Sequence, residues 1–152
     1  MKLLPAALIG AALLAPPQAR AEEAVAGPPP SEPYTPKISE IMVLQQMRHI
    51  KLWFAGRSGN WALADYEIDA LKDGFDQVNE RLGGDTVEKS VDGPLAAVEK
   101  AIEAKDRAAF AGAFDSLSAG CNSCHQALDH AFIVIQRPAT LPYTDQFFAP
   151  QK

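Results

Sequence analysis

Apolar residues recur at three- and four-residue steps along most of this chain, and that spacing constrains the fold more than any other feature. Steps of this size place side chains on one face of an α-helix. The clearest series is Trp61, Ala64, Ile68, Leu71, Phe75, Val78 and Leu82. Apolar residues at every second position, which would indicate strands, do not form a comparable series. The spacing therefore predicts an all-α fold.

Prolines, glycines and capping residues divide this pattern into four predicted helices. The first begins near Ser39, after Pro36, and ends at Gly56 or Gly59. A polar linker is predicted at 85–93. The other three helices are predicted at 61–82, 95–105 and 107–136, with start signals at Asn60, Pro94 and Asp106 and a limit at Pro138. Mostly short connections favour an up-down-up-down four-helix bundle, which builds cofactor sites from side chains on facing helices.

The two ends of the chain are predicted to lie outside this bundle, which occupies residues 37–138. Residues 1–21 match a signal peptide, with a positive Lys2, an apolar stretch and a small-residue cleavage site. That stretch is too short for a membrane span of about 20 apolar residues, although a retained anchor is the alternative. A Pro-rich leader follows at 22–36, and 139–152 is predicted to be an extended C-terminal tail along the bundle. We expect export to the periplasm, with no membrane span after cleavage.

The charge of the chain excludes one class of partner. The formal net charge is −5 and the sequence pI is about 5.1. Cleavage after residue 21 would remove Lys2 and Arg20 and no acid, which makes the mature charge −7. Nucleic acid is not expected as a partner, because no basic patch is available to replace its counterions. An acidic surface is compatible with docking to a protein that carries a positive patch.

The run Cys121-Asn122-Ser123-Cys124-His125 has the spacing of a c-type haem attachment site. The two cysteines, three residues apart, lie on one side of a helical turn and can form thioethers with the haem vinyl groups. His125 follows at once and can reach the iron as proximal ligand. The alternatives are a disulfide, a dithiol pair or half of a zinc site, which needs about four ligands. We expect one covalent haem c bound by Cys121 and Cys124, with His125 on the iron.

An exported chain with four helices and Cys121, Cys124 and His125 in the fourth resembles the class II c-type cytochromes, cytochrome c′ and its low-spin relatives. The resemblance covers roughly residues 39–136. It implies a haem at one end of the bundle, with His125 proximal and a first-helix residue on the other side of the iron. The chain differs from the family in lacking Lys or Arg at 126–130 and in having a longer ending.

Three first-helix residues, Met42, Met47 and His49, are candidates for the sixth position on the iron. If the fourth helix reaches residue 136, His125 lies about 16 Å from its end, and the same depth in the first helix falls at His49. A fourth helix shorter by about five residues favours Met42. We expect His49, because a histidine on an apolar helix face is destabilising unless something satisfies it. The alternative is a hydrogen-bonded bundle histidine, or one bound to a haem propionate.

Four other polar residues have surface roles as their simplest interpretation. Arg48, Lys51 and Arg137 are candidates for pairing with haem propionates, although solvated surface charges are commoner. His130 follows His125 by five residues, so it is predicted to face away from the iron.

These features predict a non-enzymatic electron-transfer cytochrome. A six-coordinate iron would change oxidation state with little rearrangement, and the acidic surface would meet an unidentified redox partner protein. The first alternative is a five-coordinate, cytochrome c′-like protein that binds nitric oxide or carbon monoxide. The second is a non-haem helical protein with a Cys121–Cys124 disulfide. The wide apolar arc of the first helix makes a homodimer plausible.

Overall fold

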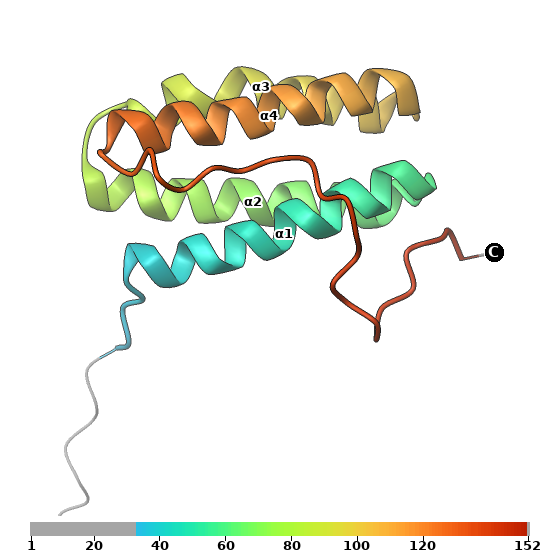
Figure 1. The fold of residues 1–152 in the computed structure, drawn as a ribbon, viewed down its shortest axis with the longest axis horizontal. Coiled ribbons are helices and arrows are strands. Elements are labelled where there is room, and N and C mark those ends of the chain that lie inside the picture. The colour runs from blue at the N-terminus through green and yellow to red at the C-terminus, as the bar shows by residue number, and fades with distance from the viewer. Residues whose placement is uncertain (1–32, 152) are drawn as a thin grey trace, which may run out of the picture. The chain divides into compact units, whose positions relative to one another are not determined.

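The computed structural model describes residues 33–151. The predicted signal peptide and most of the predicted leader lie outside this range. Within it the chain is all-helical and contains no strand, which confirms the all-α part of the predicted fold. Its helices are α1 (Ile38–Ser58), α2 (Trp61–Leu82), α3 (Thr86–Glu103) and α4 (Arg107–Ala127). Figure 1 shows that consecutive helices run in opposite directions, α1 beside α2 and α3 beside α4.

The apolar faces of all four helices meet in one core. Its centre holds three aromatic side chains, with the rings of Trp53 and Phe114 5.1 Å apart and those of Phe110 and Phe114 6.0 Å apart. Such offset and tilted pairs add to the stabilisation from burial alone. The largest fully buried side chains are Phe110, Phe114, Leu52, Ile68, Leu71, Leu117, Val78, Val91 and Val98. From Ala64 to Val78 the predicted apolar series of α2 is therefore the face that is buried.

Capping residues start two of the helices where the sequence predicts. The Asn60 side chain accepts a hydrogen bond from the Leu63 amide (3.3 Å), and Asp106 accepts from the first amides of α4 (2.9 and 3.0 Å). Gly59 ends α1 with a φ of 75°, a left-handed conformation that suits glycine. Gly56, by contrast, lies inside α1, where a Cβ would collide with the Phe110 ring. Its role is close packing.

The third helix begins earlier than predicted. Residues 86–93, expected to be a linker, form the first two turns of α3, and Pro94 lies inside the helix. Val87 and Val91 are buried at four-residue steps before Leu95, so they extend the same apolar stripe. Pro94 has no amide hydrogen to donate to the carbonyl four residues earlier. That carbonyl, on Ser90, points at Gly120 of α4, where a Cβ would collide with it.

The fourth helix ends earlier than predicted. It stops at Ala127, not near residue 136, and Asp129 follows with a φ of 60°. Pro138 was therefore only an upper limit. The extended tail begins about ten residues before the predicted boundary at 139, and it turns back to run between α4 and α1 (Figure 1).

The tail is attached to the bundle by several side-chain contacts. The Arg137 guanidinium pairs with Asp115 (2.5 Å) and lies over the Trp53 ring, 4.4 Å from its centroid. Further on, Phe148 is buried against Phe54, with the ring centroids 6.1 Å apart. The tail thus packs against the helices over most of their length. None of the helices within residues 33–151 is long and apolar enough to cross a membrane.

The contact between Gly120 and the Ser90 carbonyl predicts a large difference between two similar substitutions. Gly120→Ala should destabilise the fold by about 1–3 kcal/mol, because backbone atoms of α3 and α4 would have to separate. Gly112→Ala on the same helix meets nothing within 4 Å and should stabilise it by about 0.5–1 kcal/mol. Urea unfolding of both variants measures the difference. Equal unfolding midpoints would show that the two helices do not approach this closely.

Candidate functional site

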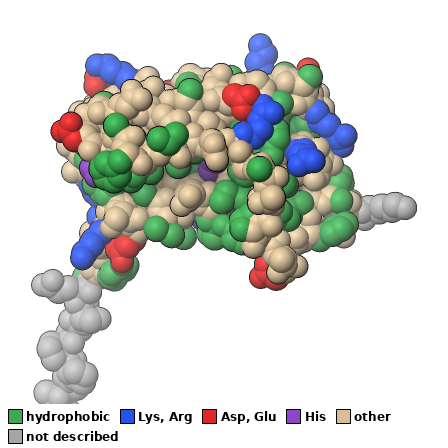
Figure 2. All heavy atoms as spheres, viewed as in Figure 1, with side chains coloured by type: hydrophobic (Ala, Val, Ile, Leu, Met, Phe, Trp, Pro, Cys, Tyr) green, Lys and Arg blue, Asp and Glu red, His purple; other side chains and the backbone are tan. Residues whose placement is uncertain are grey.

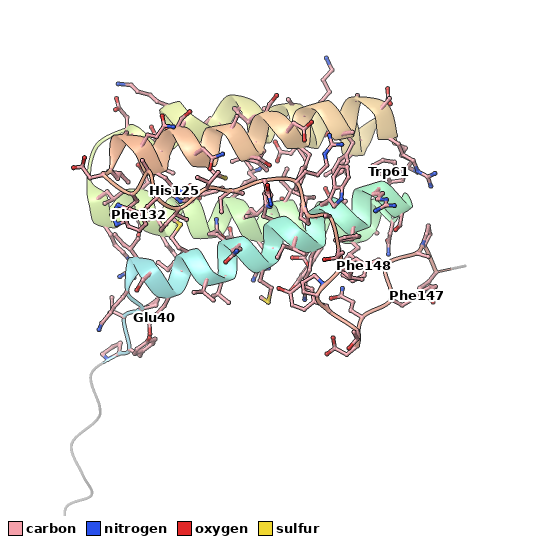
Figure 3. The ribbon with its side chains drawn as sticks, viewed as in Figure 1. Glu40, Trp61, His125, Phe132, Phe147 and Phe148 are labelled. Atoms are coloured by element: carbon pink, nitrogen blue, oxygen red, sulfur yellow. The ribbon has the colours of Figure 1, made fainter. Side chains whose placement is uncertain are left out.

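A cavity of about 570 Å³ lies between the helices and the tail, and its lining is mainly apolar. Residues of α1 and α4 line it, together with side chains of α2, α3 and the tail. Figure 3 places Glu40, near the start of α1, and His125, near the end of α4, at the same end of the bundle. The cavity is of the size that binds small molecules and cofactors in other proteins. All three predicted functional residues of α4, Cys121, Cys124 and His125, line it.

Cys121 and Cys124 lie one helical turn apart on the wall of this cavity. Both are free thiols in the structure. Burial raises the pKa of the Cys121 thiol to about 12, and burial also raises the pKa of Cys124. Both side chains are therefore neutral thiols at physiological pH. Among residues 33–151 no group of three or more His, Cys, Asp or Glu side chains is placed to hold a metal ion.

His125 has a defined tautomer. Its Nδ1 lies 2.9 Å from the backbone oxygen of Ile133. A carbonyl oxygen only accepts, so Nδ1 carries the hydrogen and donates it. The lone pair of the neutral ring is therefore on Nε2. A histidine whose second nitrogen donates to a carbonyl is the usual arrangement for a metal ligand.

His49 is buried and makes a hydrogen bond of its own. Its Nε2 lies 2.8 Å from the Ser118 hydroxyl, and that hydroxyl donates to the backbone oxygen of Phe114 (3.0 Å). Since the hydroxyl hydrogen is used in that bond, Nε2 of His49 is the donor to Ser118. Burial lowers the pKa of His49 to about 4, so the ring is neutral. This is the hydrogen-bonded bundle histidine that the sequence left as an alternative, and it also lines the cavity.

The His49–Ser118 bond fixes the level of α1 against α4. The two helices run in opposite directions (Figure 1). Met42 lies seven residues before His49 in α1, and His125 lies seven residues after Ser118 in α4. Seven residues are about two helical turns, or about 10 Å, so each residue lies on the same helix face as its bonded neighbour and both lie in the same direction from the bond. Met42 is half-buried and lines the cavity. The choice of His49 as the residue level with His125 rested on a longer α4, and that premise is wrong.

The remaining sequence-based candidates lie in other places. Met47 does not line the cavity. His130 was predicted to face away from the iron, yet it lines the cavity while remaining exposed. The three basic side chains do not line the cavity either. Arg48 pairs with Glu67 (3.6 Å), Lys51 lies over the Tyr143 ring, and Arg137 pairs with Asp115.

Sequence reasoning missed two polar residues next to the site. Gln45 is buried and donates from Nε2 to the backbone oxygen of Leu71 (2.7 Å). Asn122 makes a pair of hydrogen bonds with the backbone of Ile135 (2.8 and 2.7 Å). Gln45 lies four residues after Ile41 and four before His49, on the same face of α1, and a polar residue on that face indicates a buried hydrogen bond. No local pattern pointed to the partner of Asn122.

Comparisons of the chain with protein-family models, with curated proteins and with solved structures found no match. The functional argument therefore rests on the chemistry and geometry of this cavity.

The low pKa of His49 predicts a loss of stability in acid. The unfolded chain takes up a proton on this ring below its ordinary pKa of 6.5, whereas the folded chain does so only near 4. The unfolded state thus binds more protons as the pH falls from about 6.5 to about 4. Stability should decline over that window by on the order of 3 kcal/mol.

Urea unfolding of the wild type and of His49→Gln, at several pH values between 7 and 4, measures this contribution. The wild type should lose more stability than the variant as the pH falls. If both lose stability in parallel, the folded chain does not hold His49 neutral.

Proposed function

We propose that this chain is an exported c-type cytochrome that transfers electrons through one covalently bound haem, as its resemblance to the class II cytochromes implies. The observation that carries the proposal is that Cys121, Cys124 and His125 line one apolar cavity, with the free lone pair of His125 on Nε2. Bound haem would supply one-electron iron chemistry. The cavity lining suits the apolar macrocycle.

The two cysteines have the protonation state, and His125 has the hydrogen-bond arrangement, that this role needs. Forming a thioether adds a thiol S–H across a vinyl C=C bond, so no group leaves and no oxidant is consumed. Cys121 and Cys124 are present as reduced, neutral thiols. Binding of iron by His125 needs a neutral ring with an unprotonated nitrogen, and the bond to Ile133 provides that tautomer.

We further propose Met42 as the sixth ligand, in place of His49. Met42 is level with His125 and lies on the cavity wall, and its thioether is a known axial ligand in cytochromes c. The Nε2 hydrogen of His49 is committed to Ser118. His49 lies seven residues, about 10 Å along α1, from the level of Met42 and His125. His49 is then a neutral residue that lines the cavity without binding the iron.

Export and the partner belong to the same proposal. Residues 1–21 would direct the chain to the periplasm, where attachment of haem to Cys121 and Cys124 takes place in organisms that export such cytochromes. After cleavage the net charge would be −7. A redox partner with a basic patch would be steered toward this surface, with an association rate that falls as salt is added.

The absorption spectrum of the purified, matured protein tests the proposal. We expect a Soret band, sharp α and β bands on reduction, and haem that stays with the protein after extraction with acidified acetone. The double variant Cys121→Ala, Cys124→Ala should lose the covalent haem, whereas Ser123→Ala should keep it. Absence of a Soret band from the wild type would contradict the proposal. A broad high-spin spectrum with rapid carbon monoxide binding would favour the five-coordinate alternative.

The sixth ligand is tested by three further variants. Met42→Leu keeps the side-chain volume and should convert the low-spin spectrum to high-spin, because the thioether is lost. Met47→Leu is the matched control and should leave the spectrum unchanged, since Met47 is not on the cavity wall. His49→Gln should also stay low-spin. Loss of the low-spin bands in His49→Gln alone would assign the sixth position to His49.

A further inference from the structure

The first part of the tail forms one wall of the cavity. We call residues 129–137 the strap. Its side chains alternate: Ile133, which is 42% exposed, and half-buried Ile135 line the cavity, whereas Phe132 and Val134 are 80% and 71% exposed. Alternation of this kind is typical of an extended segment whose successive side chains point to opposite sides. Figure 3 places Phe132 at the same end of the bundle as His125, where the strap leaves α4, and Figure 2 shows apolar side chains exposed in that part of the surface.

The strap is held to α4 by side-chain hydrogen bonds, from Asn122 of the cysteine motif and from Arg137 to Asp115, not by a neighbouring strand. The Asn122 amide nitrogen donates to the backbone oxygen of Ile135 (2.8 Å), and its oxygen accepts from the Ile135 amide (2.7 Å). One side chain thereby satisfies both backbone groups of one strap residue, as a paired strand would.

The two hydrogen bonds between Asn122 and Ile135 determine which backbone oxygen of the strap lies next to His125. Asn122 and His125 are one helical turn apart, about 4.5 Å along α4. Ile135 and Ile133 are two residues apart in an extended segment, about 6.6 Å. The strap therefore runs back along α4 with Ile135 at Asn122 and the Ile133 carbonyl at Nδ1 of His125. A shift of the strap by one residue would replace that carbonyl with an amide and a side chain.

We propose that Asn122 is a positioning residue for the iron ligand: it fixes the strap so that the Ile133 carbonyl accepts the Nδ1 hydrogen of His125. This inference rests on the proposed haem function. The bond makes the imidazole a stronger electron donor. It therefore favours ferric over ferrous iron and lowers the midpoint potential. The strap is thus a regulator of the redox potential as well as a cover.

If the strap only covered the cavity, disrupting it would change the midpoint potential in the opposite direction. Opening an apolar wall admits water, which stabilises the charged ferric site and lowers the potential. Losing the hydrogen bond to His125 raises the potential. The sign of the change therefore separates the positioning role of Asn122 from a merely structural one.

Three variants of the full, matured chain test the proposal by redox titration. Asn122→Ala removes both bonds to Ile135, and its midpoint potential should rise. We expect the ferrous-to-ferric ratio at fixed potential to change three- to tenfold, and tenfold corresponds to about 59 mV for one electron. Ser123→Ala is the neighbouring control, since the Ser123 hydroxyl bonds only within α4 and is exposed. It should leave the potential unchanged.

Ile135→Ala is the second control, because it opens the apolar wall while keeping the backbone pair with Asn122. Its potential should fall or stay the same. An unchanged or lower potential in Asn122→Ala would overturn the positioning role.

Solvent exchange of the His125 Nδ1 hydrogen, followed by NMR, gives a second readout that does not depend on redox activity. The exchange should be slow in the wild type and in Ser123→Ala, and at least tenfold faster in Asn122→Ala. Equal exchange in all three would overturn the inference while leaving the haem function intact. A wild type without a Soret band would instead overturn the haem function, and the potential-setting role with it.

Discussion

The hydrogen bond between His49 and Ser118 is the interaction on which the site depends. Helix α1 packs mainly against α2 and helix α4 mainly against α3, and the tail runs between α1 and α4. Apolar contact alone would set their relative level weakly. A neutral imidazole has one N–H to donate, and here it is buried. A slip by one turn would leave that donor unsatisfied, at about 1–3 kcal/mol. The bond thus holds Met42 level with His125.

The sequence predicted three of the four helices to within a few residues at their starts. Periodicity and capping residues are local signals, and Asn60 and Asp106 make the bonds expected of them. The first two turns of α3 were missed because Pro94 was interpreted as a helix start. Val87 and Val91 carried the correct signal. The Ser90 carbonyl, which Pro94 leaves without an amide donor, lies against Gly120 of α4, and no local pattern reveals that contact.

The residues of the site that are neighbours in the sequence were predictable, and the α1 residue that lies level with them was not. Cys121, Cys124 and His125 line one cavity because they are neighbours on one helix. The residue level with His125 depends on where α4 ends, and Pro138 gave only an upper limit. The end of α4 reflects a competition between helix and extended chain. The β-branched residues at 133–135 favour an extended segment, and the Asn122 side chain supplies hydrogen-bond partners for its backbone. Such a bond spans thirteen residues and leaves no periodic trace.

The fastening of the tail favours electron transfer over gas binding within the proposed function. The strap is held on either side of the Ile133 carbonyl, by the helix end before it and by Asn122 and Asp115 after it. The hydrogen bond to His125 therefore has little freedom to lengthen. An imidazole fixed at Nδ1 would resist both rotation and withdrawal from a bound iron. An electron carrier gains from that resistance, because its two oxidation states then differ little in geometry. A site that must change its coordination on binding a gas would work against it.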